Sequence, residues 1–293
     1  MKKILVIGSI CLENVLYTDS SDQAQENEQP DNHLTNIAGK GANQAASIHF
    51  LGGDVTFYGA IGKDENGKRV KTFLDTIGVR NNLKLSSEDT GVASIIVDAN
   101  GLRSSEVIVP GANMDVSPED IDKIDFSQYD YLLMQLENPI DTVVYAMKKA
   151  RDNGLVVCLN PAPYRKLPLE AYPLIDFFIP NEKELNEFTK ECEGEMEQKI
   201  IYLLNAGVKR VVVTLGERGS YYADSDQSFL MPSFKVKTVD KSGAGDCYCG
   251  SFVTALSIDR TIRDSMEFAS KASSLVVTKK GAIAALPHLE DMR

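Results

Sequence analysis

Short apolar runs alternate with helical patterns along most of the chain, and this alternation limits the fold more than any other feature of the sequence. Apolar runs rich in β-branched residues predict strands, and amphipathic segments between them predict helices. The expected strands lie at 2–8, 54–62, 129–136, 154–160, 175–181 and 209–216, and the expected helices at 41–53, 64–78, 138–154 and after Asn181. Because the strands are apolar throughout, we expect an α/β fold with a parallel sheet flanked by helices on both faces.

Two regions interrupt this alternation. Residues 19–33 are polar and predict an exposed loop, whereas 91–109 predict a β-hairpin that turns at Asn100 and Gly101. The expected partners of the hairpin are the segments 13–18 and 33–37. A small sheet without interleaved helices, inserted into an α/β domain, suggests a lid over a site, formed from segments at about 11–37 and 91–110.

Charge and composition exclude several classes of function. The chain of 293 residues carries a net charge of −11, and no dense run of Lys or Arg supplies the footprint of a nucleic-acid-binding protein. No stretch approaches 18 consecutive apolar residues, so no membrane span is expected. The N-terminal apolar run is short and lacks a cleavage site, which favours a buried strand over a signal peptide. Five cysteines, an odd number, indicate reduced thiols and a cytoplasmic protein.

The segment 239–252 (VDKSGAGDCYCGSF) contains the run Gly243-Ala244-Gly245, followed by Asp246 and an apolar, helix-compatible stretch. The first turn of a helix has unpaired N–H groups and a partial positive charge, so small residues there can form a cradle for phosphoryl oxygens. An acid at the same place can act as the base toward an attacking hydroxyl. Alone, the run also fits a simple helix entry with a surface acid. The cysteines Cys247 and Cys249 have a metal-like spacing, but no second Cys or His pair accompanies them.

Three further segments have the composition of a ligand site. In AGKGANQAA, Gly39, Lys40, Gly41 and Asn43 open a helix and offer backbone and amide groups to sugar hydroxyls. In PNEKE, Asn181 and Glu184 either form a capping box or orient hydrated Mg²⁺ and phosphate. In VVVTLGERG, the residues Thr214, Gly216 and Gly219 lie at a strand end, and the alternative explanation for them is a hairpin turn. No Walker P-loop is present in the sequence.

These motifs together resemble the ribokinase family of carbohydrate kinases. The segments AGKGANQA, LLMQLENP, LNPAP, PNEKE, VTLGERG and DKSGAGD occur in the order found in that family, from GSI at 8–10 to KKGA at 279–282. The resemblance implies a single kinase domain over 1–293, with a small β-sheet lid that often forms a dimer clasp. It also implies ATP-dependent phosphorylation of a primary hydroxyl, with D-ribose as the leading substrate, Mg²⁺ as a cofactor and no nucleic-acid or membrane partner.

The resemblance also assigns roles to residues. Asp246 is the expected general base, and the amides of Gly243, Ala244 and Gly245 are the expected anion hole. The expected sugar contacts are Cys11, Glu13, Gly39, Lys40, Gly41, Asn43, Glu137 and Asp246, and the nucleotide contacts are Asn181, Thr214, Gly216, Gly219, Gly245 and Ser270. Glu184 is expected to bind Mg²⁺ through water. A monovalent cation, K⁺ in the family, is expected at Asp240, Ser242, Val276, Lys279 and Gly281.

The sequence departs from the family pattern at both ends of the site. Cys11 and Glu13 stand where the family has an Asn and an Asp that bind ribose hydroxyls, and a thiol is a poor hydrogen-bond partner. AQEN at 24–27 replaces a Pro-Gly-Glu-Thr element of the lid. Lys241 replaces a small Thr or Pro, and Ala285 replaces a hydroxyl ligand of the cation. We therefore expect weakened K⁺ activation, with the Lys241 ammonium either supplying local positive charge or pointing to solvent.

Other functions remain open on sequence grounds. A kinase for deoxyribose, fructose, another sugar, a sugar phosphate or a nucleoside such as adenosine would use the same base and anion hole. A catalytically inactive sugar-binding regulator on the same scaffold belongs to a different class. The presence of Asp246 together with the Gly-Ala-Gly run favours an enzyme over that regulator.

Overall fold

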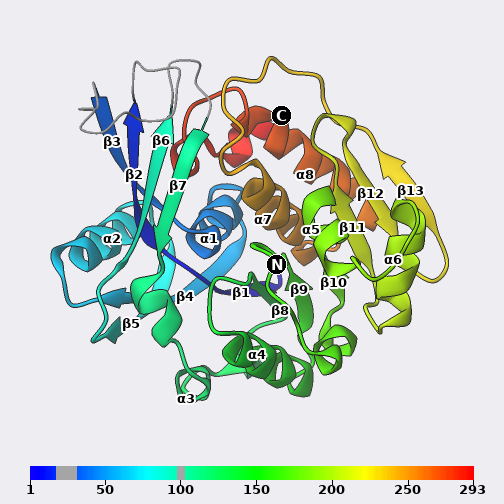
Figure 1. Cartoon of the computed structure of the whole chain (residues 1–293), viewed down its shortest axis with the longest axis horizontal. Coiled ribbons are helices and arrows are strands. Elements are labelled where there is room, and N and C mark those ends of the chain that lie inside the picture. Colours follow the sequence, from blue (N-terminus) through cyan, green and yellow to red (C-terminus); the bar gives the residue numbers. More distant parts are fainter. Residues whose placement is uncertain (18–31, 98–102) are drawn as a thin grey trace.

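A nine-stranded, mostly parallel sheet forms the centre of the protein (Figure 1). The structure is a computed structural model that describes residues 1–17, 32–97 and 103–293. From edge to edge the strands are β13 (Ser228–Met231), β12 (Ser220–Ala223), β11 (Val211–Thr214), β10 (Phe177–Phe178), β9 (Val156–Leu159), β8 (Tyr131–Met134), β1 (Lys3–Ile7), β4 (Asp54–Gly62) and β5 (Arg80–Ser86). The predicted parallel sheet is confirmed for the strands from β11 to β5.

One edge of the sheet differs from the prediction. Strand β12 pairs antiparallel with β11, and β13 pairs antiparallel with β12; the strands β5, β12 and β13 were not expected from the sequence. The reason is the turn at 215–219, which is too short for a helical crossover and therefore returns the chain beside β11 as a hairpin.

Helices cover both faces of the sheet and enclose two apolar cores. One face carries α1 (Lys40–Phe50), α2 (Glu65–Thr76), α7 (Ala244–Ser257) and α8 (Ile262–Val276), and the other carries α3 (Pro118–Ile121), α4 (Ile140–Asp152), α5 (Glu182–Phe188) and α6 (Met196–Asn205). Strand β1 shows why both faces are covered: Ile4 and Val6 belong to the first core, and Leu5 and Ile7 to the second. Figure 1 shows α7 and α8 on one side of the central strands and α4 on the other.

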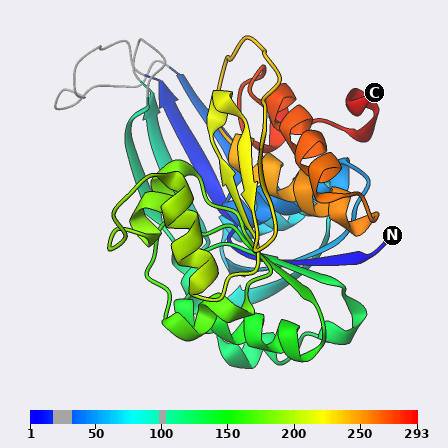
Figure 2. The same ribbon diagram turned by 90° about the vertical axis from the view of Figure 1, so that its right-hand side faces the viewer.

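A separate four-stranded sheet has the order β3-β2-β6-β7. The sequence predicted a small separate sheet from these segments but not the order of its strands. Its strands are β2 (Cys11–Tyr17), β3 (Asn32–Ala38), β6 (Gly91–Val97) and β7 (Arg103–Val109). The hairpin of β6 and β7 is antiparallel, and β2 joins it in parallel. Figures 1 and 2 show these strands at one side of the molecule, projecting beyond the large sheet. The predicted loop at 19–33 and the turn at Asn100 and Gly101 lie almost wholly outside the described residues.

The carboxyl ends of the parallel strands point to one edge of the large sheet. Chain segments that follow β1, β8, β9, β10 and β11 therefore meet there, beside the N-termini of α1, α5 and α7. In open α/β sheets, this edge is where ligands bind. Within the described parts of the chain, no helix is both long and apolar enough to cross a membrane.

Candidate active site

Asp246 lies in the first turn of α7 and is only 8% exposed. The helix has 14 residues, and its N-cap is Gly243, with a φ of 73° in the left-handed region that favours glycine. The first helical hydrogen bond runs from Cys247 N to the carbonyl of Gly243 at 2.8 Å. The N–H groups of Ala244, Gly245 and Asp246 therefore precede the helical hydrogen-bond ladder, and the positive end of the helix lies at the same point.

The backbone of this turn is open at Gly245. A methyl group placed on Gly245 would meet no other atom within 4 Å, whereas one on Gly243 would meet Ala282 at 3.1 Å. The N–H of Ala244 is already directed to the carbonyl of Lys241 at 3.3 Å. The open surface of the turn is therefore centred on Gly245 and Asp246, and its amides fit an anion at this helix end.

Helix α1 approaches Asp246 from the other side of the site. Its N-cap Gly39 has a φ of 106°, and Gly41 packs directly on the turn after β1. A methyl group on Gly41 would lie 2.7 Å from backbone atoms of Gly8 and Ser9. The glycines of AGKGAN thus allow a close approach of backbones. The amide of Lys40 donates to Oε2 of Glu137 at 3.2 Å, and the Ser9 hydroxyl donates to the same oxygen.

Both oxygens of Asp246 accept hydrogen bonds from α1. Asn43 donates through Nδ2 to Oδ2 at 2.8 Å, and Gln44 donates through Nε2 to Oδ1 at 3.0 Å. The structure thus brings together the predicted residues Asn43 and Asp246, which are 203 positions apart. The sequence interpretation assigned no role to Gln44, although it stands beside Asn43 in the same motif. Oδ1 of Asn43 is buried and has no hydrogen-bond partner among the described residues.

Asn181 and Glu184 form a complete capping box at the start of α5. The Glu184 amide donates to Oδ1 of Asn181 at 2.8 Å, and the Asn181 amide donates to Oε2 of Glu184 at 2.9 Å. Burial raises the pKa of Glu184, the hydrogen bond from the Asn181 amide and the nearby Lys40 ammonium lower it, and the charge of Asp246 raises it further. The pKa of Glu184 therefore depends on charged residues of both α1 and α7.

The carboxylates of Glu184 and Asp246 fit a hydrated metal ion better than a directly bound one. Among the described residues, no group of three or more His, Cys, Asp or Glu is placed to hold a metal. Mg²⁺ keeps several of its waters and binds through one or two carboxylates plus substrate phosphates, and the half-buried Glu184 can accept hydrogen bonds from such waters.

The two cysteines of α7 are buried next to this site. Burial raises the pKa of Cys247 to about 11 and that of Cys249 well above its usual range, so both thiols are protonated near neutral pH.

The turn that joins β11 to β12 lies beside Asn181. Asn181 and Thr214 form a parallel bridge, and the Thr214 amide donates to the carbonyl of Pro180 at 2.9 Å. Gly216 and Gly219 have φ values of 59° and 101°. The hairpin turn therefore gives a structural explanation for both glycines. The same turn also places backbone groups at the edge of the site. The Ser270 hydroxyl on α8 donates to the carbonyl of Pro232 at 3.4 Å, in the segment after β13.

The segments expected to bind a monovalent cation are held together by Asp240. Its Oδ1 accepts from the amide and hydroxyl of Ser242 at 2.9 and 2.7 Å, and its Oδ2 accepts from the amide of Gly281 at 2.9 Å. The carbonyl of Val276 accepts from the amide of Lys279 at 3.1 Å. The five predicted positions therefore lie in two adjoining segments, one before α7 and one that runs from the last residue of α8 to Gly281.

Lys241 lies at the surface of this region. Its side chain is 73% exposed and forms an ion pair of 3.4 Å with Glu217, whose side chain is 82% exposed. Such a pair in solvent contributes about 0–1 kcal/mol to stability. Of the two interpretations of Lys241, the exposed position agrees with the one in which the side chain points to solvent.

Cys11 and Glu13 belong to β2, and both are half-buried. They are two residues apart on a strand and so share one face of the small sheet. Cys11 pairs with Ala38 on one side and Gly91 on the other. Cys11 therefore lies where the small sheet joins the segment that leads into α1.

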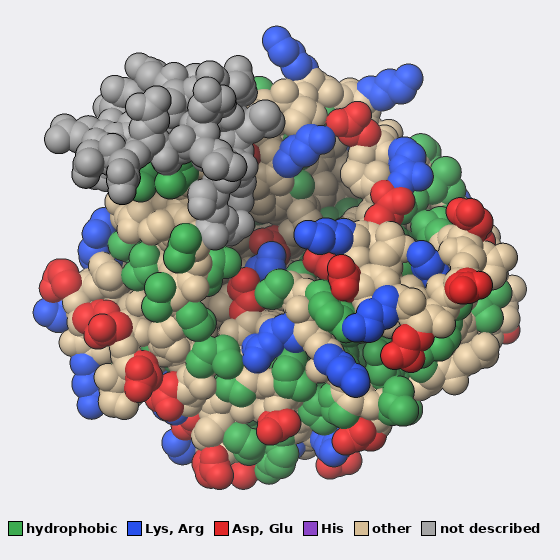
Figure 3. Space-filling view, in the orientation of Figure 1, with side chains coloured by type: hydrophobic (Ala, Val, Ile, Leu, Met, Phe, Trp, Pro, Cys, Tyr) green, Lys and Arg blue, Asp and Glu red, His purple; other side chains and the backbone are tan. Residues whose placement is uncertain are grey.

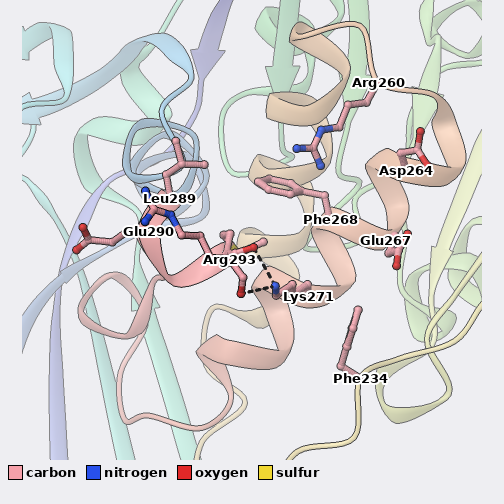
Figure 4. Close-up of a pocket in the computed structure, with 10 residues that line it drawn as sticks. Phe234, Arg260, Asp264, Glu267, Phe268, Lys271, Leu289, Glu290 and Arg293 are labelled. Carbon is pink, nitrogen blue, oxygen red and sulfur yellow. Dashed lines mark hydrogen bonds between the residues drawn. The ribbon is translucent and has the colours of Figure 1, made fainter.

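The face of the molecule in Figure 3 is hollowed between the small sheet and the β11–β13 side, and acidic and basic side chains lie in this hollow. Two cavities lie elsewhere. One, of about 850 Å³, lies between the outer face of α8 and the C-terminal residues, where Lys271 Nζ donates to the carbonyls of Met292 and Arg293 at 2.8 and 3.0 Å (Figure 4). The other, of about 460 Å³, lies between the small sheet, α2 and residues 281–288.

The whole chain matches a known family of enzymes. Residues 1–289 match the model of the pfkB family of carbohydrate kinases. The chain belongs to this family. The expectation of an ATP-dependent, ribokinase-like carbohydrate kinase is thereby confirmed at the level of the family, and so is the resemblance drawn from the ordered motifs.

Individual relatives agree with this assignment. A bifunctional ribokinase/ribose-5-phosphate isomerase A from Fructilactobacillus sanfranciscensis is 37% identical, and the match covers 99% of this chain and 55% of that protein. A ribokinase from Staphylococcus aureus is 34% identical, with 99% and 98% covered. A deoxyribokinase from Salmonella typhi is 32% identical, with 98% and 96% covered. The curated sugar kinases that resemble this chain thus include both ribokinases and deoxyribokinases.

Solved structures show the same fold. The crystal structure of a ribokinase from Thermotoga maritima superposes with a TM-score of 0.92 at 31% identity, covering 100% of this chain and 98% of that one. The Arabidopsis thaliana ribokinase complexed with ribose and ATP has a TM-score of 0.90 at 28% identity, covering 99% and 97%. The predicted architecture, a large sheet flanked by helices with a small separate sheet, is therefore confirmed.

Proposed function

We propose that this chain transfers the γ-phosphoryl group of ATP to the primary hydroxyl of D-ribose and so forms ribose 5-phosphate. The observation that carries the proposal is the buried carboxylate of Asp246 at the open N-terminus of α7, with each oxygen held by an amide of α1. The names of the relatives from Staphylococcus aureus and Thermotoga maritima, which cover nearly the whole chain, support ribose as the substrate.

In this mechanism, Asp246 takes the proton of the sugar hydroxyl as that oxygen attacks phosphorus. The amides of the Gly243–Asp246 turn, chiefly the open ones of Gly245 and Asp246, receive the negative charge that develops on the transferred phosphoryl oxygens, in an environment made positive by the helix end. Asn43 offers its buried, unpartnered Oδ1 to a sugar hydroxyl, and Glu137 offers its remaining lone pairs. The work of these groups is to orient the reactants and to stabilise charge.

The nucleotide is proposed to lie against Asn181, Thr214, Gly216, Gly219 and Ser270. Mg²⁺, when bound, neutralises charge on the phosphate oxygens. Glu184 would hold the waters of that ion, and Asn181 fixes the Glu184 carboxylate through the capping box. Asp240 and its neighbours form a site for a monovalent cation. We infer that K⁺ activates weakly there, because Ala285 has no hydroxyl to offer.

The small sheet is proposed to act as a lid on the single kinase domain of residues 1–293, and also as the contact between two copies of the chain. The exposed side chains Val107, Ile108 and Val109 on β7 support this assembly, because each is 54–60% exposed in the isolated chain. Consecutive apolar residues exposed on both faces of an edge strand favour pairing with another chain.

A second candidate substrate is 2-deoxyribose. Two observations favour it: a deoxyribokinase is among the relatives, and Cys11 provides a thiol where the family has an amide that binds a ribose hydroxyl. A sugar that lacks one of the ribose hydroxyls loses less binding free energy when a thiol replaces this amide. Comparison of kcat/KM for ribose, 2-deoxyribose, fructose and adenosine decides between the candidates. Preference for adenosine would contradict both.

The experiment that tests the mechanism is turnover of Asp246→Asn with ATP and ribose. The amide cannot take the proton, so we expect kcat to fall by about 10²- to 10⁴-fold while the melting temperature stays close to that of the wild type. Undiminished turnover would show that Asp246 is not the base. A wild-type chain that binds ribose but transfers no phosphoryl group would instead support the non-catalytic sugar-binding protein.

A further inference from the structure

Three buried amide side chains lie behind Asp246, and they form one connected hydrogen-bond network. Gln44 is fully buried on α1, Gln135 follows β8, and Asn160 follows β9. Gln44 Nε2 donates to Oδ1 of Asp246 at 3.0 Å and to Oδ1 of Asn160 at 3.1 Å. Gln135 Nε2 donates to Oε1 of Gln44 at 2.6 Å. All of these bonds are shielded from water, so each contributes more than a surface bond would.

The orientation of every amide in this network is determined by its neighbours. The carbonyl of Ile179 can only accept, so Asn160 must donate to it through Nδ2, which it does at 2.9 Å. This leaves the oxygen of Asn160 to accept from Gln44. Gln135 donates to the oxygen of Gln44, so the Gln44 nitrogen is turned toward Asp246, which as a carboxylate can only accept.

The backbone leaves room for this network at one point. A methyl group on Gly8 would lie 2.1 Å from Oε1 of Gln135, so only glycine permits Gln135 to occupy its position. Oε1 of Gln135 is buried and has no hydrogen-bond partner among the described residues. Gln135 is therefore kept in the core at the cost of an unpaired oxygen that an apolar residue of similar size would not carry. This cost is explained if Gln44 needs the hydrogen bond that Gln135 Nε2 donates to it.

We propose that Gln44 is a positioning residue for Asp246, held in its orientation by Gln135 and Asn160. Gln44 fixes Oδ1 of the carboxylate while Asn43 fixes Oδ2, so that the remaining lone pairs of Asp246 point toward the sugar hydroxyl. Neither Gln135 nor Asn160 touches Asp246 in a hydrogen bond; they act through Gln44. This inference rests on the proposed role of Asp246 as the base.

The network predicts a graded set of effects. Gln44→Met keeps the size of the side chain and removes the donor to Asp246, so kcat falls about 10- to 100-fold with the sugar KM changed by less than about threefold. Gln135→Met leaves the Gln44 side chain in place but removes the hydrogen bond to its oxygen, so kcat falls by a smaller factor than in Gln44→Met. Because Gln135→Met does not alter a group next to Asp246, it also serves as the test if Gln44→Met does not fold.

Ser47→Ala is the matched control. Ser47 is also fully buried on α1 and bonds to α7, through the carbonyl of Cys247 at 3.3 Å, but it has no hydrogen bond to Asp246. Ser47→Ala is expected to lower the melting temperature to a similar extent as Gln135→Met while leaving kcat unchanged. A fall of kcat in Ser47→Ala equal to that in Gln44→Met would reduce the role of Gln44 to helix packing and would overturn the proposal.

The decisive measurement is the residual rate in an Asp246→Ala background. If Gln44 acts through Asp246, adding Gln44→Met to Asp246→Ala leaves the residual rate of phosphoryl transfer unchanged. A further fall of 10-fold or more would show that Gln44 acts on another group. An unchanged kcat in both Gln44→Met and Gln135→Met would also refute the positioning role. Full activity of Asp246→Ala alone would instead refute the proposed base, so the two failures are distinguishable.

Discussion

Asn43 Nδ2 lies 2.8 Å from Oδ2 of Asp246, and this hydrogen bond joins the first turns of α1 and α7. Both residues lie near helix N-termini, where partial positive charge stabilises a carboxylate. The bond gives Asn43 two roles. In the proposed mechanism, its nitrogen orients the base, and its buried oxygen stays available for a sugar hydroxyl. The segments AGKGANQA and DKSGAGD, which are far apart in the sequence, thus meet in one site.

The first prediction concerns Asn43→Ala. The substitution removes the donor to Oδ2 of Asp246 and the acceptor for the sugar. A hydrogen bond to a charged group contributes about 1.5–3 kcal/mol, so kcat/KM for ribose should fall at least about 10- to 100-fold. Steady-state kinetics should show a lower kcat together with a higher KM for ribose. A rise in KM alone would mean that Asn43 binds sugar without affecting the base.

The second prediction contrasts two glycines. Gly245→Ala adds a methyl group where no atom lies within 4 Å, so the free energy of unfolding should change by less than about 1 kcal/mol. The same methyl group enters the proposed anion cradle and should lower kcat at least about tenfold. Gly41→Ala instead clashes with the backbone at Gly8 and should destabilise the protein by about 1–3 kcal/mol.

Denaturant unfolding and kinetics on the same preparations distinguish the two. The expected result is a stable, slow Gly245→Ala and an unstable Gly41→Ala. Normal activity in Gly245→Ala would argue against phosphoryl oxygens at this turn.

Particular residues show how far the sequence alone predicts this site. Asn43, Glu184 and Asp246 were assigned from motifs, because helix N-termini and short polar signatures have local sequence signals. Gln44, Gln135 and Asn160 were not assigned, although all three lie within segments that resembled the family. Their roles depend on which strand ends become neighbours and on how far each side chain reaches, and neither property is local. The strands β12 and β13 were not predicted, although a hairpin turn at 215–219 was one of two interpretations of that segment and a nucleotide site was the other.

The third prediction uses the raised pKa of Glu184. A carboxyl group whose pKa is raised by burial stabilises the folded state fully at low pH, and this contribution is lost as the pH rises through the folded-state pKa. Glu184→Gln keeps a capping-box acceptor for the Asn181 amide but has no charge to bury. The variant should therefore gain melting temperature relative to the wild type as the pH rises from about 4 to 8.

Thermal melts without Mg²⁺ or nucleotide measure this difference. Glu187→Gln is the control, because Glu187 is exposed on the same helix. Equal shifts in both variants would indicate a general charge effect of α5. Turnover of Glu184→Gln should fall at the same time and should require more Mg²⁺, if Glu184 holds metal-bound water.

The last prediction separates Lys241 from Ala285 as the cause of the proposed weak K⁺ activation. Lys241 is exposed and paired with Glu217, so Lys241→Thr should change the free energy of unfolding by less than about 1 kcal/mol and should leave the response to K⁺ unaltered. Ala285 is fully buried in the segment after Gly281, which Asp240 ties to the N-terminus of α7. Ala285→Ser adds an oxygen there and should increase stimulation by K⁺ over Na⁺ and choline. Turnover at matched ionic strength decides between the two residues. Strong K⁺ stimulation of the wild type would contradict the proposal of a weak K⁺ site. K⁺ dependence that appears only in Lys241→Thr would show that the Lys241 ammonium takes the place of the K⁺ charge in the wild type.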